Sequence, residues 1–380
     1  MTRIELGSVV HGMTLDDAAP DWPALTSEEL TAVLSDLPGL GRATAQVSWH
    51  SPRPMSTSAR VRVGDTHVFV KRHHHAVRDD GRLRLEHRFS DYLRSRGVET
   101  PRVHRRDDGT SVTRRGEYLY EVFDIAKGED RYADVASWLP YHSPVDAGHA
   151  GAALARFHEA SEGFFEPATP WSVLVDSTDL LTSVDPFETL SELVSTRPGL
   201  ALGLSEFSYF EDLAAILLDP LSRAREATME ERALWTHGDW HPSNLTWDQT
   251  GEVASVIDLS LANRTFALRD VALAIERAVV DWLDAAGRGE TSVDEDSLRA
   301  LLSGYHARRP LRGSDREVLA TLLPVVHVEF ALSEVEYFAA VTGSLTNRDL
   351  AYRSYLLDHV EWFASARGRE LLDIVLRGDW

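Results

Sequence analysis

The chain has 380 residues and no cysteine, which excludes disulfide bonds, thiolate catalysis and cysteine-ligated zinc sites. Its net charge of −21 argues against a general affinity for nucleic acids, because their phosphates would repel it. The hydrophobic fraction of 43% and the charged fraction of 26% are typical of a globular protein, and the length favours two domains.

The first third of the chain predicts a small lobe rich in β-strands. A capping box from Thr26 to Glu29 begins a helix that Pro38 would end. Short strand-like runs, separated by turn-forming residues, follow at 44–50, 58–64 and 66–72. A helix is predicted over 82–97 and a further strand over 117–124. The histidines of 73–75 are interpreted as a solvated turn rather than a metal-binding tract.

From about Val145 onwards the pattern changes to long helices with apolar periodicity. They are predicted over 147–161, 207–227, 325–341 and 352–376. We therefore expect an α+β protein in which a small, mainly antiparallel β lobe precedes a larger helical lobe. The expected segments are an N-terminal helical extension packed on the small lobe (1–40), the small lobe itself (41–125) and the helical lobe (126–380).

Charge is distributed unevenly along the chain. Between Arg42 and Arg115 there are 17 Lys and Arg against 8 Asp and Glu, although the whole chain is acidic. This pattern suggests a basic lobe for an anion, joined to an acidic lobe. The amino-terminal residues lack a long apolar core, and no later stretch approaches 18 uninterrupted apolar residues. We expect a cytoplasmic protein, a monomer or a homodimer, with neither membrane nor nucleic acid as a partner.

The segment 234–262 carries the densest set of chemically active residues. His237, Gly238 and Asp239 are followed by Asn244, and two predicted strands then lead to Asp258. The spacing from Asp239 to Asn244 equals that of the kinase catalytic loop, in which an Asp accepts the proton of the acceptor hydroxyl and an Asn holds magnesium. Carboxylate and amide oxygens are hard ligands that suit Mg²⁺.

These motifs resemble those of the aminoglycoside phosphotransferases and their relatives, including choline, homoserine and methylthioribose kinases, which have a protein-kinase-like two-lobed fold. The resemblance rests on H-G-D-W-H-P-S-N at 237–244, V-I-D at 256–258, F-V-K at 69–71, Glu86, and A-L-A-R-F-H-E-A-S at 153–161. It implies that Asp239 is the catalytic base and that His237 shapes the loop. It also implies that Asn244 and Asp258 are the magnesium ligands.

Lys71 is one of only two lysines in a chain that otherwise uses Arg. By the resemblance, a lysine on the third strand contacts the α- and β-phosphates and pairs with a helical carboxylate, for which Glu86 is suitably placed. Arg has a different donor geometry, which explains why a Lys is kept here. No glycine-rich loop precedes this strand, and residues 51–58 stand in its place. The phosphate donors expected there are Ser56, Thr57 and Ser58.

The implied activity is that of an ATP-dependent small-molecule kinase, which transfers the γ-phosphoryl group to a hydroxyl of an antibiotic- or metabolite-like acceptor with Mg²⁺. Residues 121–129 would bind adenine through backbone groups, and because this recognition is mostly main-chain, GTP is an alternative nucleotide. The acidic helical lobe favours a cationic or polyhydroxylated acceptor. Asp270 matches a family aspartate at a helix start, where it would cap the helix and support the loop.

Two other functions are compatible with parts of the sequence. His237, Asp239 and His241 form an H-x-D-x-H array, which alternates onto one face if extended and would suit a metal-dependent hydrolase. That reading explains neither Asn244 nor Lys71. A nucleotide-binding pseudokinase would keep the fold without turnover, and the complete catalytic set argues against it.

Overall fold

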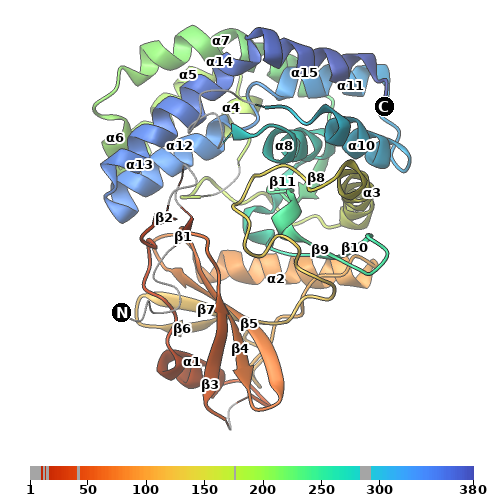
Figure 1. Ribbon diagram of the computed structural model, residues 1–380. Helices are drawn as coiled ribbons and strands as arrows, with labels where there is room; N and C mark the ends of the chain where they lie inside the picture. Colours follow the sequence, from red (N-terminus) through yellow and green to blue (C-terminus); the bar gives the residue numbers. More distant parts are fainter. Residues whose placement is uncertain (1–9, 12, 14–16, 41–42, 175–176, 283–291) are drawn as a thin grey trace. The chain divides into compact units, whose positions relative to one another are not determined.

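The computed structural model describes residues 10–11, 13, 17–40, 43–174, 177–282 and 292–380, which form two compact units (Figure 1). The described residues of 1–139 and 242–258 make the first unit. Those of 140–241, 259–282 and 290–380 make the second.

A five-stranded antiparallel sheet in the order β3-β4-β5-β7-β6 is the centre of the first unit. Its strands are β3 (Ala45–His50), β4 (Thr57–Val63), β5 (Thr66–His74), β6 (Thr113–Arg115) and β7 (Tyr118–Asp124). In the middle strand, Lys71 lies opposite Ser58 of β4 and Glu121 of β7. Because directly opposite residues share a face of the sheet, these three side chains point the same way.

Two helices accompany this sheet. Helix α1 (Ser27–Leu34) begins at the predicted capping box, in which Thr26 and Glu29 exchange side-chain-to-backbone hydrogen bonds. Its buried residues Leu30, Val33 and Leu34 belong to the same apolar core as Val61 and Val68 of the sheet. Helix α2 (Asp80–Ser95) begins after Asp79, whose carboxylate accepts the backbone N–H of Arg82. The short strands β1 (Val10–His11) and β2 (Asp17–Ala18) pair with each other.

A later hairpin also belongs to the first unit, which differs from the predicted boundary at 125/126. It consists of the 3₁₀ turn η1 (Pro242–Asn244) and the strands β9 (Leu245–Trp247) and β10 (Val253–Val256). Glu129 and Trp247 exchange backbone hydrogen bonds of 2.7 and 2.9 Å, and Ser255 Oγ donates to the carbonyl oxygen of Lys127. These bonds attach the hairpin to the segment that follows β7. The first unit therefore consists of more than one segment of the sequence.

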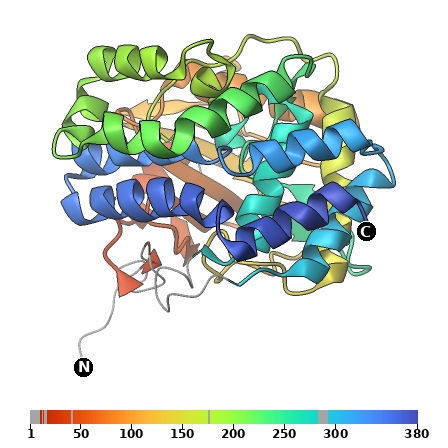
Figure 2. The same cartoon turned by 90° about the horizontal axis from the view of Figure 1, so that it is seen from above.

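The second unit is mainly helical. Its helices are α3 (Pro144–Ser161), α4 (Asp179–Thr182), α5 (Pro186–Thr196), α6 (Pro198–Leu204), α7 (Tyr209–Thr228), α8 (Ala267–Val279), α10 (Glu295–His306), α11 (Gly313–Leu322), α12 (Val328–Glu336), α13 (Leu345–Leu350), α14 (His359–Phe363) and α15 (Ala366–Arg377). The π-helical segments η3 (Tyr337–Thr342) and η4 (Ala351–Asp358) continue α12 and α13. Figure 2 shows the green α7 lying alongside the blue C-terminal helices. Among the described residues, every helix is too short or too polar to cross a bilayer.

Helix α8 lies at the centre of this unit, and all its residues from Leu268 to Val279 are buried. A helix buried on all sides is enclosed by other elements rather than lying on a surface. Beside it, β8 (Ala233–Thr236) pairs antiparallel with β11 (Asn263–Phe266), which follows the 3₁₀ turn η2 (Leu259–Leu261). Strand β8 leads directly into His237.

The predicted solvated turn at 73–75 is wrong for His73 and His74, because both lie in β5. His73 is buried, and its Nε2 donates to Glu121 Oε1 at 2.7 Å. The run of three identical residues concealed the strand period, which turns alternate side chains to opposite faces.

Candidate active site

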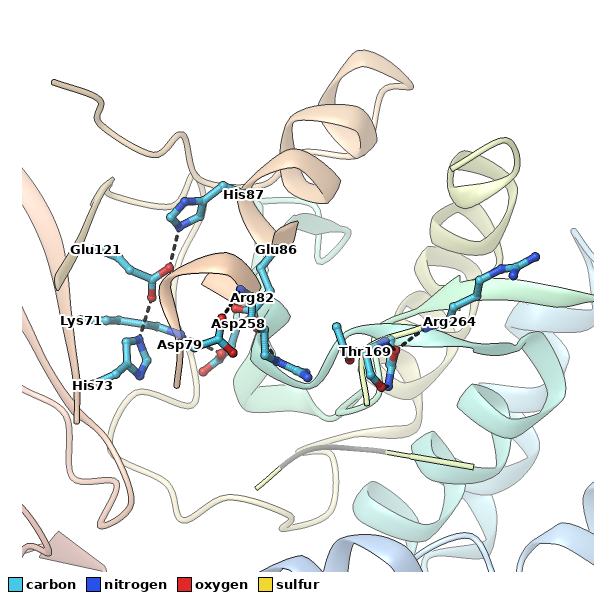
Figure 3. A network of polar contacts seen from close by, with 11 residues as sticks. Lys71, His73, Asp79, Arg82, Glu86, His87, Glu121, Thr169, Asp258 and Arg264 are labelled. Carbon is cyan, nitrogen blue, oxygen red and sulfur yellow. Dashed lines mark hydrogen bonds and ion pairs between the residues drawn. The ribbon is translucent and has the colours of Figure 1, made fainter. Parts of the chain in front are cut away.

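The ion pair between Lys71 and Asp258 is the central feature of the first unit (Figure 3). Lys71 Nζ lies 2.7 Å from Asp258 Oδ1, and the two side chains are 15% and 33% exposed. Burial alone would lower the pKa of the Lys71 ammonium, but the carboxylates of Asp258 and Glu121 outweigh it, so the pKa is raised. The group is therefore a permanent cation that keeps partial access to solvent.

Asn244 and Asp258 are brought together by the β9–β10 hairpin. The backbone N–H of Ile257 donates to the carbonyl oxygen of Asn244 at 2.9 Å. Asp258 itself has φ +59°, in the left-handed region that few non-glycine residues adopt. Such strain is tolerated mainly where function requires it. The set formed by an amide oxygen and a partly exposed carboxylate, with an ammonium beside them, fits a magnesium-bound polyphosphate.

The expected ion pair between Lys71 and Glu86 is wrong. In the part of the chain that the structure describes, Lys71 pairs with Asp258, whereas Glu86 Oε1 accepts from Arg82 Nε at 3.0 Å (Figure 3). The physical reason is local, since Arg82 lies one helical turn before Glu86 on the same face of α2. Burial raises the pKa of Glu86, and Arg82 only partly offsets it.

Glu121 is a buried carboxylate that sequence reasoning missed. It accepts hydrogen bonds from His73 Nε2 at 2.7 Å and from His87 Nε2 at 2.5 Å (Figure 3). Burial would raise its pKa, but these two hydrogen bonds outweigh it and lower the pKa. A signal was present, because Glu121 lies between apolar and aromatic residues of the strand. From the neighbouring strand, the Glu121 carboxylate places negative charge near the Lys71 ammonium.

The three expected phosphate donors are placed at the start of β4. Thr57 and Ser58 are buried within the strand, and Ser56 precedes it. Ser58 lies opposite Lys71, and its carbonyl oxygen accepts the N–H of Ser51 at 2.9 Å. Contact of Ser56, Thr57 and Ser58 with phosphates stays a prediction.

In the second unit, Asp270 supports the turn that carries Asp239. Its two carboxylate oxygens accept the backbone N–H groups of His237 and Gly238, each at 2.9 Å. Gly238 has φ +75°, which glycine adopts without strain. His158 Nε2 donates to Asp270 at 3.1 Å, so the supporting carboxylate is held in turn. Loop support by Asp270 is confirmed, but the helix cap of α8 is at Phe266.

Asp239 lies in a cationic environment within the same unit. The backbone N–H of Asp239 donates to His237 Nδ1 at 3.2 Å, a contact within the loop that His237 was predicted to shape. Asp239 Oδ2 is 3.3 Å from His241 Nε2, and Oδ1 forms an ion pair with Arg277. Burial would raise the pKa of Asp239, but His241 and Arg277 outweigh it and hold the pKa well below its ordinary value.

The geometry does not favour a metal site on His237, Asp239 and His241. His237 Nδ1 is used by a backbone N–H and Asp239 by Arg277, so neither is a free ligand. Over the described ranges, the group of ligand atoms close enough to share one ion is formed by His74, His75 and Glu117. His74 Nδ1 accepts the N–H of Ala76, which places the ring proton on Nε2 and blocks that nitrogen as a ligand.

Comparison with known proteins places this geometry in a family. A sequence profile of the phosphotransferase enzyme family matches residues 51–311. The chain is 27% identical over 218 residues to the homoserine kinase of Gluconobacter oxydans, and this match covers 54% of the chain and 60% of that kinase. The chain thus spans less than two thirds of this relative.

Solved structures show the same fold. A microcompartment-associated aminopropanol kinase matches with a TM-score of 0.55 and 16% identity, covering 93% of this chain and 100% of that one. An amicoumacin kinase in complex with AMP-PNP, Ca²⁺ and Ami matches with a TM-score of 0.53 and 12% identity, covering 93% and 94%. These likenesses confirm the predicted kinase-like α+β fold. Because the matched profile spans well over half of its residues, the chain belongs to the phosphotransferase enzyme family.

Proposed function

We propose that this chain is an ATP-dependent small-molecule kinase that transfers the γ-phosphoryl group to a hydroxyl of an amine-bearing or polyhydroxylated acceptor. The observation that carries the proposal is the 2.7 Å ion pair between Lys71 and Asp258, formed by a strand lysine and a hairpin carboxylate. A structural ion pair would be satisfied by any cation, whereas this chain uses one of its two lysines.

The first unit would bind the nucleotide. Lys71 would contact the phosphates, and Asn244 and Asp258 would hold Mg²⁺, which when bound neutralises phosphate charge. The segment that follows β7 is held within the first unit by backbone hydrogen bonds at both ends. The N–H of Asp124 donates to the carbonyl oxygen of Arg102, and Glu129 exchanges backbone hydrogen bonds with Trp247. Ile125 and Ala126 lie between these hydrogen bonds, so we assign purine recognition to their backbone groups. ATP is the nucleotide proposed, and GTP is the alternative.

The second unit would supply the base. Asp239 would accept the proton of the acceptor hydroxyl as that oxygen attacks the γ-phosphorus and ADP leaves. Asp270 and His237 hold the turn from which this carboxylate projects. Asp239 and the proposed metal ligand Asn244 are five residues apart in the sequence.

The acceptor class follows from charge and from the relatives. The chain has a net charge of −21 although residues 42–115 are basic, so the rest of the chain attracts cations. The homoserine kinase and the aminopropanol kinase are named for acceptors that combine an amine with a hydroxyl. An amino alcohol, an amino acid with a hydroxyl side chain or an aminated sugar satisfies both observations.

An acceptor screen with product identification tests this proposal. The protein is incubated with ATP, Mg²⁺ and each member of a panel containing homoserine, aminopropanol, choline and aminoglycosides, and products are identified by mass spectrometry. We expect at least one acceptor to gain a phosphoryl group with equimolar ADP. Hydrolysis of a panel compound without nucleotide, in the presence of zinc or manganese, would instead support the hydrolase. Tight nucleotide binding with no turnover on any acceptor would favour the pseudokinase.

A further inference from the structure

The loop of residues 51–56 joins β3 to β4 at the end of the sheet where Lys71 lies. Strand register places Ser58, which follows this loop, opposite Lys71. In the proposed function the Lys71 ammonium binds phosphate oxygens, so bound phosphates would lie beside the loop. The loop contains two prolines and no glycine. Its backbone therefore has fewer accessible conformations than that of a glycine-rich loop.

Arg53 lies between the two prolines, Pro52 and Pro54. The ring of each proline fixes its own φ, and a residue that precedes proline is restricted to extended conformations. The carbonyl oxygen of Pro52 accepts the N–H of His11 at 2.9 Å. The N–H of Arg53 donates to Ser51 Oγ at 3.3 Å. The direction in which the Arg53 side chain leaves the loop is therefore restricted by its own neighbours.

The Arg53 guanidinium reaches the turn segment formed by residues 130–135. Its Nη1 donates to the carbonyl oxygen of Val135, and its Nη2 donates to the carbonyl oxygen of Tyr132 at 3.5 Å. The planar fork of an arginine allows one side chain to hold two acceptors in this way. The turn segment follows Ile125 and Ala126 closely in the sequence, and we assign purine recognition to those residues. Arg53 thus connects the loop beside Lys71 to the segment beyond the proposed purine contacts.

Side chains of the two flanking strands contact the same turn segment. Arg60 Nη2 of β4 lies 2.8 Å from Asp130 Oδ2, and the Arg60 guanidinium lies 4.9 Å from the centre of the Trp49 ring. Trp49 Nε1 of β3 donates to Asp134 Oδ1 at 3.3 Å. Arg53 therefore adds a contact from the loop itself to contacts that the strands already make.

The turn segment is in turn fixed to the β9–β10 hairpin. Tyr132 is buried, and the centre of its ring lies 6.2 Å from that of Trp247. Arg131 Nη2 donates to the carbonyl oxygen of Asp248 at 3.3 Å. This hairpin leads to Asp258, one of the proposed magnesium ligands. Contacts therefore run from the loop, through the turn segment, to the hairpin that precedes the proposed metal site.

We propose that Arg53 is a positioning residue for the nucleotide, which holds the loop 51–56 on the turn segment so that the loop is already formed when phosphates bind. This role rests on the proposed function. Without the guanidinium, nucleotide binding would have to order the loop, and the lost conformational entropy would weaken binding. The expected phosphate donors at 56–58 would then be in place less often, and bound nucleotide would leave faster.

The test compares Arg53→Met and Arg53→Lys with Arg62→Met. Arg62 is an exposed arginine at the end of β4 remote from the loop, and its guanidinium also donates to a backbone carbonyl oxygen, that of Gly64, at 3.4 Å. It controls for the loss of an arginine hydrogen bond within the same hairpin. The dissociation rate of an ATP analogue carrying a fluorescent mant group is measured with Mg²⁺ by stopped flow, with excess ATP as the chase. The melting temperature of each protein is recorded, as are kcat and KM for ATP with the acceptor found in the screen.

We expect Arg53→Met to release the labelled nucleotide about tenfold faster and to raise KM for ATP to a similar extent, because the loop is no longer held in advance. Its kcat at saturating ATP should change little, since the lost interaction acts on nucleotide binding and not on the base. Arg53→Lys keeps a charged donor that can reach one of the two carbonyl oxygens, so its release rate should lie between those of Arg53→Met and the wild type. Arg62→Met should match the wild type.

The role is overturned if folded Arg53→Met and Arg53→Lys both release the nucleotide at the wild-type rate, or if Arg62→Met releases it as fast as Arg53→Met. A lower melting temperature with unchanged release would show that Arg53 acts on the stability of the fold alone, which also contradicts the role. If Arg53→Met fails to fold, Arg53→Lys decides: wild-type release contradicts the role, and faster release supports it. A wild-type protein that binds no labelled nucleotide would contradict the proposed function itself, whereas binding that ignores Arg53 contradicts only its role as a positioning residue.

Discussion

Lys71 lies among carboxylates of the first unit, with Asp258 as its ion-pair partner at 2.7 Å. Strand register places Glu121 directly opposite, and both carboxylates contribute to the raised pKa of the ammonium. In the proposed function, the Lys71 ammonium would exchange a carboxylate for phosphate oxygens, which a point charge on a flexible stem can do without reorienting a planar group. The proposal therefore requires the geometry of a lysine at this position and not only its charge.

Replacing Lys71 by Arg should therefore impair nucleotide use although the charge is kept. We expect Lys71→Arg to lower kcat/KM for ATP by about tenfold or more, equivalent to ~1.4 kcal/mol. Steady-state kinetics with varied ATP measures this. Lys127→Arg is the matched control, since its side chain is 72% exposed and pairs with Glu99 at the surface. Equal kinetics for the two variants would contradict the assigned role of Lys71.

Removing the base should abolish turnover and spare binding. Asp239→Asn is expected to lower kcat by at least about a thousandfold, because the amide cannot take the hydroxyl proton. Nucleotide affinity, measured by calorimetry with AMP-PNP, should stay close to that of the wild type. Asp219→Asn, at a side chain 78% exposed on α7, controls for the loss of one negative charge. Turnover retained by Asp239→Asn would exclude this residue as the base.

At the scale of elements, α12 carries a buried carboxylate without a hydrogen-bond partner among the described residues. Glu334 is 0% exposed, and burial raises its pKa to about 8 despite the nearby Arg277. The ordinary pKa of a glutamate is 4.5. Between these values the folded chain keeps a proton that the unfolded chain releases. The contribution of this group to the free energy of unfolding is complete below about pH 4.5. It is lost as the pH rises to about 8.

Glu334→Gln removes this titration, so its melting temperature relative to the wild type should increase with pH. We expect the difference to grow by several degrees between about pH 5 and about pH 9. Differential scanning fluorimetry across pH measures it. Glu361→Gln, at an exposed residue of α14, is the control. A difference that stays constant over the range, or falls, would show that Glu334 is not a buried neutral acid in the native state.

The elements that sequence reasoning found are those with a clear period. Strand β5 and helix α2 were predicted to within two residues of their observed starts, because apolar residues recur at the spacing of each structure. Strands β6 and β8 are short, and three or four residues carry no measurable period. The Lys71–Glu86 ion pair was mispredicted because Arg82, one turn away, takes Glu86. Arg277 was missed because its partner Asp239 is distant in sequence, although a charged residue in an apolar helix was a usable signal.

At the scale of the whole molecule, the basic excess of the chain lies within one of the two structural units. Residues 42–115, which carry the basic excess, belong to the unit that holds Lys71 and Asp258. A basic unit should attract a polyanionic nucleotide over distances comparable to the Debye length, which is about 10 Å at 0.1 M salt. The motifs led to the candidate site residues, but the assignment of 242–258 to the first unit required the hydrogen bonds of Glu129 and Trp247.

Salt should therefore weaken ATP capture more than it slows turnover. Raising KCl from about 0.05 M to about 0.5 M should increase KM for ATP several-fold while kcat at saturating substrates changes little. Parallel titrations with a zwitterionic osmolyte control for effects other than ionic strength. An unchanged KM for ATP would show that the basic excess does not act on the nucleotide.

The most direct test of the account is calorimetric titration of AMP-PNP into the wild type and into Asp258→Asn and Asp239→Asn, with and without Mg²⁺. Asn keeps the left-handed backbone accessible at 258, so that variant removes mainly the charge. The account predicts Mg²⁺-dependent binding by the wild type and by Asp239→Asn, and its loss in Asp258→Asn. Binding that is equal in all three proteins and indifferent to Mg²⁺ would contradict it.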